Sequence, residues 1–295
     1  MRHLRSTLSI LIPLLAASLA ACLAASCARP VPPASEVEAA FIDPLPSGPE
    51  AAAWRKIPVY SAQLIPQDLV EPRLMQPSTT HLRVQAATDG TRVVFRLAWD
   101  DITLNDVPGP ASFADACAVQ LPRTTEPDVP DPQMGQPGRP VEITYWKASW
   151  QASIDGRPDT IQAIYPGAVV DHYPFDAPPL EPGSEAQKEF ARRYAPADAA
   201  GNRREGPRDR AVEDLVAEGP GTLKPAGASL SEGSGRRATD GWEVVIARPL
   251  PAGLAAGGRS QIAFGVWDGG QGEVGSRKMR SGWVPLSIGA PGAAR

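Results

Sequence analysis

The chain has 295 residues with 27 glycines and 33 prolines, and its formal net charge is −4. So much glycine and proline predicts many loops and few long helices, and the small negative charge argues against a nucleic-acid-binding surface. The length suffices for one large all-β domain or two modest ones.

The N-terminus is predicted to be an export signal. Basic residues precede an apolar run, Leu8 to Ala21, that is too short to span a bilayer. The run ends Leu19-Ala20-Ala21-Cys22, which looks like a bacterial lipobox. We therefore expect residues 1–22 to be a lipoprotein-type signal peptide and Cys22 to be lipidated. Lipidation at Cys27 and ordinary signal cleavage are the alternatives.

Export places the protein in the periplasm, and a lipid on Cys22 would attach it to a membrane. Residues 23–46 are rich in proline, alanine and serine. This composition is typical of an extended tether to a folded domain.

Strand patterns dominate the rest of the chain. Apolar and polar residues alternate in most of the predicted strands, and Asp89-Gly90 is typical of a hairpin turn. The clearest strands are His81 to Ala87, Thr91 to Asp100, Val141 to Gln151, Gly241 to Arg248, Gln261 to Trp267 and Ser281 to Ile288, and Ala114 to Pro122 is strand-like. They predict an all-β fold, an antiparallel β-sandwich over residues 47–289 with short peripheral helices and long Pro/Gly-rich loops. Residues 290–295 would be a short tail.

Residues 174–221 interrupt this pattern with charge and proline. Ser184 and Gln187 form a capping box that predicts a helix from Glu185 to Tyr194. We interpret the segment as a loop insertion. It could cover an edge of a binding pocket, face a partner subunit or simply be solvated.

Met134 stands out because it lies in a polar, proline-rich loop between two strand-like runs. A methionine there loses the burial that would stabilise it by roughly 1.5–3 kcal/mol, so something apolar should cover it. Its thioether could be core filler, or it could be a soft axial ligand of haem iron.

Lys278 opens an alternating run that continues through Arg280, Gly282, Val284, Leu286 and Ile288, with Met279 on the opposite face. Burying an ammonium is costly, so such a lysine tends to lose its proton, and a neutral amine can bind iron. The alternative is a side chain that simply reaches solvent.

Other ligand candidates are few. Lys147 alternates with apolar residues in its strand and is the one serious competitor among the lysines, while Met75 and Met279 are the other methionines outside the leader. His81 and His172 are the only histidines outside the leader and would be the only bis-histidine pair. The chain has no C-x-x-C-H motif, so no covalent c-type haem is expected. Cys117 lies in a strand-like run and is expected to be an inert buried thiol.

Signs of catalysis are weak. Asp100 and Asp101 follow one another at a strand end, where they could serve acid–base chemistry or bind a hard cation. A turn is the favoured interpretation of this pair. The glycines at Gly269 to Gly272 are not followed by a helix that would make a phosphate-binding loop. We expect no catalysis by this chain alone.

Seven segments together resemble a known family. In chain order they are ATDGTRVVFRLAWDD, ADACAVQLP, PQMGQP, ITYWKASWQ, AEGPGTL, DGWEVVIARPL and GSRKMRSGW. Their ordered set resembles the haem-binding gamma subunits of the type II dimethyl sulfoxide reductase family, which includes ethylbenzene dehydrogenase, dimethyl sulfide dehydrogenase, selenate reductase and chlorate reductase. Relatives are mostly soluble periplasmic subunits, so a lipid anchor would be a departure.

The resemblance implies a β-sandwich that holds a b-type haem non-covalently between a methionine and a lysine. The matching positions are Met134 and Lys278. It also implies two partners, a molybdenum-containing catalytic subunit and an iron–sulfur subunit. Our hypothesis is that the haem exchanges electrons between the iron–sulfur subunit and a soluble periplasmic c-type cytochrome. A haem subunit of a different respiratory complex is an alternative.

A second class of function is compatible with the same pattern. Five strand tryptophans could form an aromatic platform for sugars, namely Trp146, Trp150, Trp242, Trp267 and Trp283. The protein would then be an exported carbohydrate-binding lipoprotein without cofactor.

Overall fold

A computed structural model describes residues 34–292, apart from 108, 110, 126–127, 169–180, 182, 196 and 198–204. These residues belong to one compact unit that begins at Ala34. The predicted signal peptide, Cys22 and Cys27 lie outside the described residues. Within the described part, no helix is both long and apolar enough to cross a membrane.

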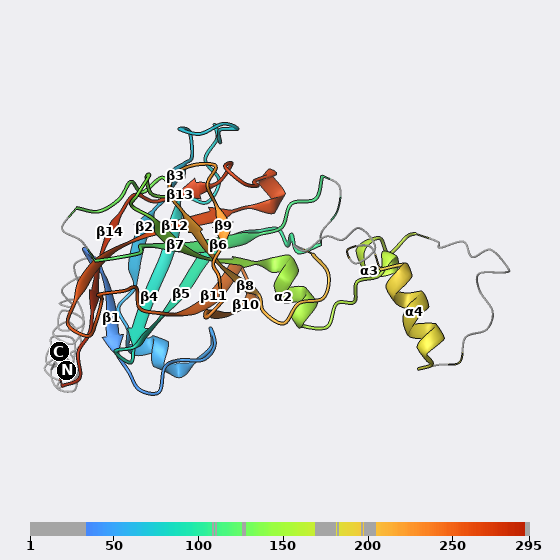
Figure 1. Cartoon of the computed structure of the whole chain (residues 1–295), viewed down its shortest axis with the longest axis horizontal. Coiled ribbons are helices and arrows are strands. Elements are labelled where there is room, and N and C mark those ends of the chain that lie inside the picture. The colour runs from blue at the N-terminus through green and yellow to red at the C-terminus, as the bar shows by residue number, and fades with distance from the viewer. Residues whose placement is uncertain are drawn as a thin grey trace, which may run out of the picture. The chain divides into compact units, whose positions relative to one another are not determined.

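The fold is all-β, as predicted (Figure 1). Its strands are β1 Val37–Phe41, β2 Tyr60–Gln63, β3 Ile65–Pro66, β4 His81–Thr88, β5 Arg92–Asp100, β6 Ala116–Pro122, β7 Val141–Lys147, β8 Val212–Ala217, β9 Lys224–Pro225, β10 Glu232–Ala238, β11 Gly241–Pro249, β12 Arg259–Trp267, β13 Met279–Arg280 and β14 Val284–Ile288. The short helices are η1 Ala52–Lys56, α2 Ala148–Ile154, α3 Ile161–Ile164, α4 Glu185–Arg193 and η2 Gly269–Gln271.

The strands form two layers that share β12. Sheet A has the order β10-β11-β5-β4-β1-β14-β12, and β2 also pairs with β4; sheet B continues from β12 through β6, β7, β8 and β9, and β13 joins β12 to β3. Residues 259–262 of β12 pair with β14, whereas residues 263–267 pair with β6. The pairs are antiparallel except that β1 runs parallel to both β4 and β14.

The core lies between the two sheets. Phe95, Leu97 and Trp99 of β5 face it from sheet A, and Val119 and Trp146 face it from sheet B, all without exposed surface. These are the alternate residues of each strand, as the period of two requires. The Trp99 and Trp146 rings meet edge to face, 6.4 Å apart between centroids.

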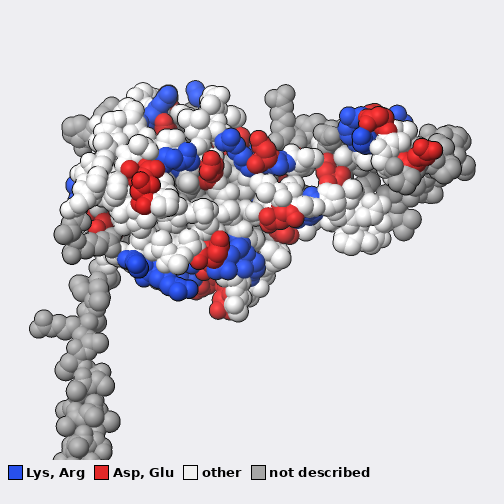
Figure 2. Space-filling view, turned by 90° about the horizontal axis from the view of Figure 1, so that it is seen from below, with Lys and Arg blue, Asp and Glu red and all other residues white. Residues whose placement is uncertain are grey.

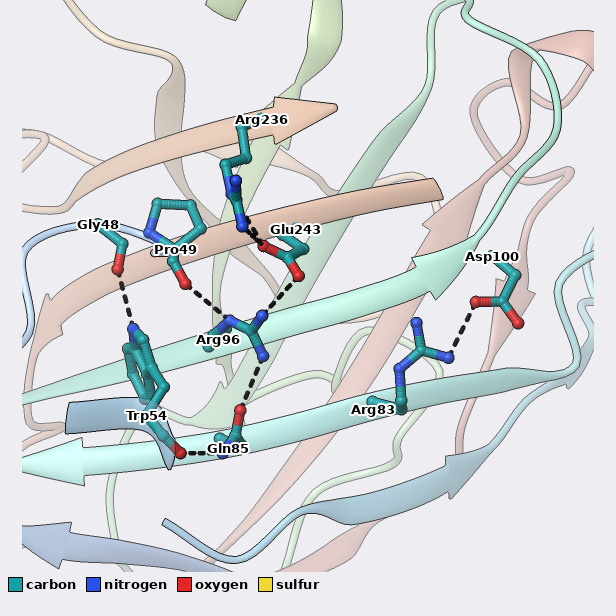
Figure 3. Close-up of polar contacts among 9 residues, drawn as sticks. All are labelled: Gly48, Pro49, Trp54, Arg83, Gln85, Arg96, Asp100, Arg236 and Glu243. Atoms are coloured by element: carbon teal, nitrogen blue, oxygen red, sulfur yellow. Dashed lines mark hydrogen bonds and ion pairs between the residues drawn. The ribbon is translucent and has the colours of Figure 1, made fainter. Parts of the chain in front are cut away.

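The outer face of sheet A is covered by the N-terminal residues (Figure 3). Arg96 of β5 donates to the Pro49 carbonyl at 3.0 Å and pairs with Glu243 at 2.6 Å. Gln85 of β4 donates to the Trp54 carbonyl at 2.6 Å, so η1 is held against the sheet. Strand β1 lies within residues 23–46 and pairs between β4 and β14, so the sandwich begins earlier than the composition predicts.

Charged side chains are mixed in sign over the surface seen from below (Figure 2). This mixture accords with the small net charge of −4.

Two strands have other boundaries than the sequence predicts. The run from Val141 leaves the sheet after Lys147, and helix α2 begins at Ala148, whose N–H donates to the Asp115 carbonyl at 2.8 Å. The run from Ser281 is interrupted, because Ser281 pairs with Phe264 through its N–H at 3.0 Å and its hydroxyl at 2.9 Å. The chain then crosses from sheet B to sheet A before Val284.

This crossing corrects the predicted face of Lys278. Val284, Leu286 and Ile288 lie in the core between the sheets together with Met279, and not on the side of Lys278. The residues from Ser281 to Trp283 shift the phase of alternation, so one continuous strand was the wrong assumption.

The predicted insertion is shorter than residues 174–221. Strand β8 lies within it and pairs with β7 along Val212–Ala217. The strand was not predicted because it contains the charged Asp214. The Asp214 carboxylate accepts hydrogen bonds from Thr144 at 2.7 Å and from the Ser231 N–H at 2.9 Å, which makes a charge acceptable in this strand. The predicted helix is confirmed as α4, and Ser184 accepts from the Gln187 N–H at 3.1 Å.

Candidate cofactor-binding cavity

The outer face of sheet B carries a cavity of about 700 Å³. Side chains that point away from the core line it, among them Ala118 of β6, Ile143 and Tyr145 of β7, and Leu215 of β8. Loops around residues 67–71, 112–114, 132–134, 220–223 and 273–278 form its walls. The volume lies in the usual range for cofactor sites, roughly 300–1,000 Å³.

The cavity has a floor of small residues. Ala118 lies opposite Gly265, and Ala263 opposite Gln120, where β6 pairs with β12. A Cβ atom on Gly265 would lie 3.2 Å from the Trp267 ring and 3.7 Å from Lys278 Cδ. Small side chains in neighbouring strands leave an open, flat surface that a planar group could occupy.

Met134 reaches the cavity from a tight loop. It has the left-handed φ of 71°, which costs a non-glycine residue roughly 1–3 kcal/mol. Its carbonyl accepts from the Gly219 N–H at 2.8 Å, and Gly135 donates to the Asp131 carbonyl at 2.8 Å. The half-buried side chain packs against the small apolar cluster that contains Val141 and Ile143. The predicted apolar cover is therefore present.

Lys278 lines the same cavity immediately before β13. Its carbonyl accepts from the Gln67 N–H at 2.9 Å, and its Nζ lies 5.0 Å from the centre of the Trp267 ring. No carboxylate of the described residues forms an ion pair with it. Burial, with a smaller contribution from Arg280, lowers the pKa of Lys278 to about 8. A neutral amine is thus accessible near neutral pH.

The competing ligands are less suitable. Lys147 also lines the cavity, but it forms an ion pair with Glu205. Met75 is 70% exposed, and Met279 is buried in the core between the sheets. His81 is exposed and contacts Thr80 at 2.9 Å, and His172 lies outside the described residues.

Cys117 is a free buried thiol, as predicted. Burial raises its pKa well above the ordinary value. The thiolate that reactive cysteines need is therefore disfavoured.

Two arginines near the cavity were not predicted as site residues. Arg280 lines the cavity, and its Nε is buried without a hydrogen-bond partner. Arg277 Nε is likewise buried without a partner, and its guanidinium lies 5.9 Å from the Phe113 ring. The basic run Arg277-Lys278-Met279-Arg280 was the available signal.

These features fit a haem. The floor is small and the walls are largely apolar, while a thioether and an amine with a lowered pKa are the donors. Haem also carries two carboxylates, and the Arg280 guanidinium, which lines the cavity, is suited to bind one of them.

The tryptophans do not form an exposed platform. Trp146, Trp150, Trp242 and Trp267 are all buried, and Trp283 donates to the Pro130 carbonyl at 2.6 Å. Trp150 and Trp267 instead line the cavity. The sugar-binding surface considered from the sequence is therefore not made by these residues.

Comparison with known proteins finds one matching family and several similar proteins. The family model for ethylbenzene dehydrogenase matches residues 51–279. A protein of Haloferax mediterranei named as a respiratory nitrate reductase heme subunit is 26% identical over 266 residues, which are 87% of this chain and 74% of that protein. The chlorate reductase subunit gamma of Ideonella dechloratans is 25% identical over 231 residues, 76% of this chain and 71% of that protein.

Among solved structures, a family 9 carbohydrate-binding module from Caldicellulosiruptor kristjanssonii in complex with cellotriose is similar. It covers 88% of this chain and 97% of its own, with a TM-score of 0.39 and 8% sequence identity. So distant a likeness carries no argument about function.

Proposed function

Since the chain belongs to the ethylbenzene dehydrogenase family, as its resemblance to the gamma subunits predicted, we propose that it is a haem-carrying, non-catalytic electron-transfer subunit of a respiratory oxidoreductase. In finer detail, it would pass electrons between the iron–sulfur subunit of a molybdenum oxidoreductase and a periplasmic c-type cytochrome. The observation that carries the proposal is that Met134 and Lys278 both line one cavity.

Met134 and Lys278 are proposed as the residues whose thioether and amine would hold the iron of a haem b. The missing C-x-x-C-H motif supports non-covalent binding. A haem bound there would supply one-electron redox chemistry, and two uncharged ligands in an apolar setting favour its ferrous form.

The other residues would prepare this site. The Lys278 amine must lose its proton before it can donate an electron pair, and burial lowers its pKa for that purpose. Arg280 would hold a carboxylate of the cofactor, since its Nε has no other partner. Ile143, Leu215 and Trp267 would exclude water from the bound group.

The visible spectrum of the purified protein tests the ligands. We expect a Soret band with low-spin features in the wild type, and loss of those features in Lys278→Ala and Met134→Ala. Lys147→Ala and Met75→Ala are matched controls, because Lys147 lines the same cavity and Met75 lies exposed away from it. An unchanged spectrum for Lys278→Ala would remove that ligand, and loss in Met75→Ala but not in Met134→Ala would reassign the sulfur.

The site of action is also a proposal. The predicted signal at residues 1–22 supports export to the periplasm, and lipidation of Cys22 would add a membrane anchor. Mass spectrometry of the mature N-terminus tests the processing. Copurification from the native host tests whether a molybdenum subunit and an iron–sulfur subunit accompany the chain.

A further inference from the structure

Three aspartates meet at the ends of three strands, beside the cavity but apart from its proposed ligands. Asp101 follows β5, Asp115 precedes β6 and Asp268 follows β12. One oxygen from each lies within 4.8 Å of the others. Asp101 is 5% exposed and Asp115 is fully buried.

No positive side chain of the described residues forms an ion pair with any of the three. Asp115 accepts hydrogen bonds from the N–H groups of Asn105 and Gly269, each at 2.9 Å, and from Trp242 Nε1 at 2.9 Å. Asp101 Oδ1 accepts from the Thr103 N–H at 2.8 Å. The nearby Arg237 donates to the backbone carbonyl of Asp101 and not to its carboxylate.

Asp101 Oδ2 is the unexplained atom. It is buried and has no hydrogen-bond partner. A buried carboxylate oxygen without a partner is costly, and the cost increases beside two further carboxylates. Burial raises the pKa of Asp115 to about 6, and Asp101 adds to that rise. The pKa of Asp268 is raised by burial and by Asp101 as well.

Further oxygens lie around the same point. A Cβ atom on Gly270 would lie 2.6 Å from Thr103 Oγ1, 3.1 Å from Asn105 Oδ1 and 3.1 Å from Asp268 Oδ1. Asp101, Thr103 and Asn105 alternate along one loop, a spacing that lets several side chains turn to one centre. All of these donors are hard oxygen atoms, which calcium prefers.

We propose that Asp101, Asp115 and Asp268 bind one calcium ion, with Asn105 and Thr103 close enough to complete its coordination. Oxygens bound to one calcium at roughly 2.3–2.6 Å lie at most about 5.2 Å apart, so the observed spread fits a single ion. The ion gives Asp101 Oδ2 its missing partner and offsets the repulsion among the carboxylates.

The ion would also fix part of the cavity wall. Asp101 and Asp115 enclose residues 102–114, and Phe113 and Ala114 of this loop line the cavity. Asp268 directly follows Trp267, another lining residue. Calcium binding itself does not depend on the proposed haem.

Calorimetric titration of the purified, chelator-treated protein with calcium chloride tests the proposal. We expect one site in the wild type, and binding roughly tenfold or more weaker in Asp268→Asn. Asp100→Asn is the matched control, because Asp100 is adjacent to Asp101 but pairs with Arg83 at the surface, at 2.9 Å (Figure 3). Its affinity should equal that of the wild type. Equal affinity in Asp268→Asn would overturn the site.

Thermal unfolding of the wild type supplies a test that needs no variant. Calcium should raise the melting temperature of the chelator-treated protein, and EDTA should reverse the rise. Absence of both heat and thermal shift would overturn the proposal and leave the aspartates as a metal-free cluster that shares protons.

Discussion

Replacing Lys278 with methionine should stabilise the haem-free protein at pH 7. The side chain lines an apolar cavity, and no carboxylate of the described residues pairs with it. Burial, followed by the charge of Arg280, lowers its pKa from 10.5 to about 8. Methionine has a similar length and carries no charge, so Lys278→Met removes the cost of holding an ammonium there.

The size and sign of the change in unfolding free energy follow from the lowered pKa of Lys278. A fall from 10.5 to about 8 corresponds to at most about 3 kcal/mol, and water in the empty cavity reduces that cost. We expect Lys278→Met to gain about 1–3 kcal/mol of unfolding free energy at pH 7. The unfolded chain holds this proton more tightly than the folded chain, so wild-type stability rises from pH 8 toward pH 10.5. The advantage of the variant should therefore shrink at pH 10.

Urea unfolding of the haem-free proteins at pH 7 and pH 10 measures both effects. Lys224→Met is the matched control, since Lys224 is exposed in β9 and its replacement should change little at either pH. A variant no more stable than the wild type at pH 7 would refute a buried, uncompensated amine. So would a gain that stays the same at pH 10.

Three further predictions concern the cavity and the core. Acidification of the haem-loaded protein should release the amine first, because a proton competes for Lys278 Nζ and not for the Met134 thioether. Visible spectra recorded during an acid titration should therefore change in the wild type but not over the same pH range in Lys278→Met. Gly265→Leu should lower the haem content, because the new side chain enters the cavity floor beside the Trp267 ring; normal haem content in the folded variant would contradict a haem on that floor. Gly235→Ala should cost about 1–3 kcal/mol in urea unfolding, because a Cβ there would lie 2.3 Å from Trp146 Cζ2; unchanged stability would show that the ring moves aside freely.

The sequence predicts several strands well from β-rich runs bounded by turn residues. The strands at His81 and Gly241 were predicted within a residue or two, although residues on both of their faces are buried. Strand β8 was missed because its charge suggests a loop, and only the distant donors Thr144 and Ser231 explain why Asp214 is tolerated. Strand β1 was missed because it occupies a proline-rich segment and pairs in parallel with strands far along the chain.

The cavity shows the same limit. Met134 and Lys278 were identified as unusual residues, but spacing could not show that they share one cavity. Arg280 was placed on the Lys278 face, yet its buried, unpartnered Nε becomes visible only with its neighbours in place. Asp101 was considered for a hard cation and interpreted as a turn, since Asp115 and Asp268 meet it only after folding.

The two sheets explain why the cavity forms on sheet B. On sheet A, Trp54 and Ile57 cover the outer face and pack against Ala87, Val94 and Val245. On sheet B, small residues replace such a cover, and loops build walls instead.

The backbones of both proposed ligands are anchored by hydrogen bonds. The Met134 carbonyl accepts from the Gly219 N–H at 2.8 Å, and the Lys278 carbonyl accepts from the Gln67 N–H at 2.9 Å. The backbone atoms from which the two side chains extend are therefore fixed, while the thioether and the amine form no hydrogen bond with the described residues. This arrangement lowers the conformational entropy that cofactor binding would cost. The left-handed backbone of Met134 fits this role, since a strained conformation persists only where the surrounding hydrogen bonds hold it.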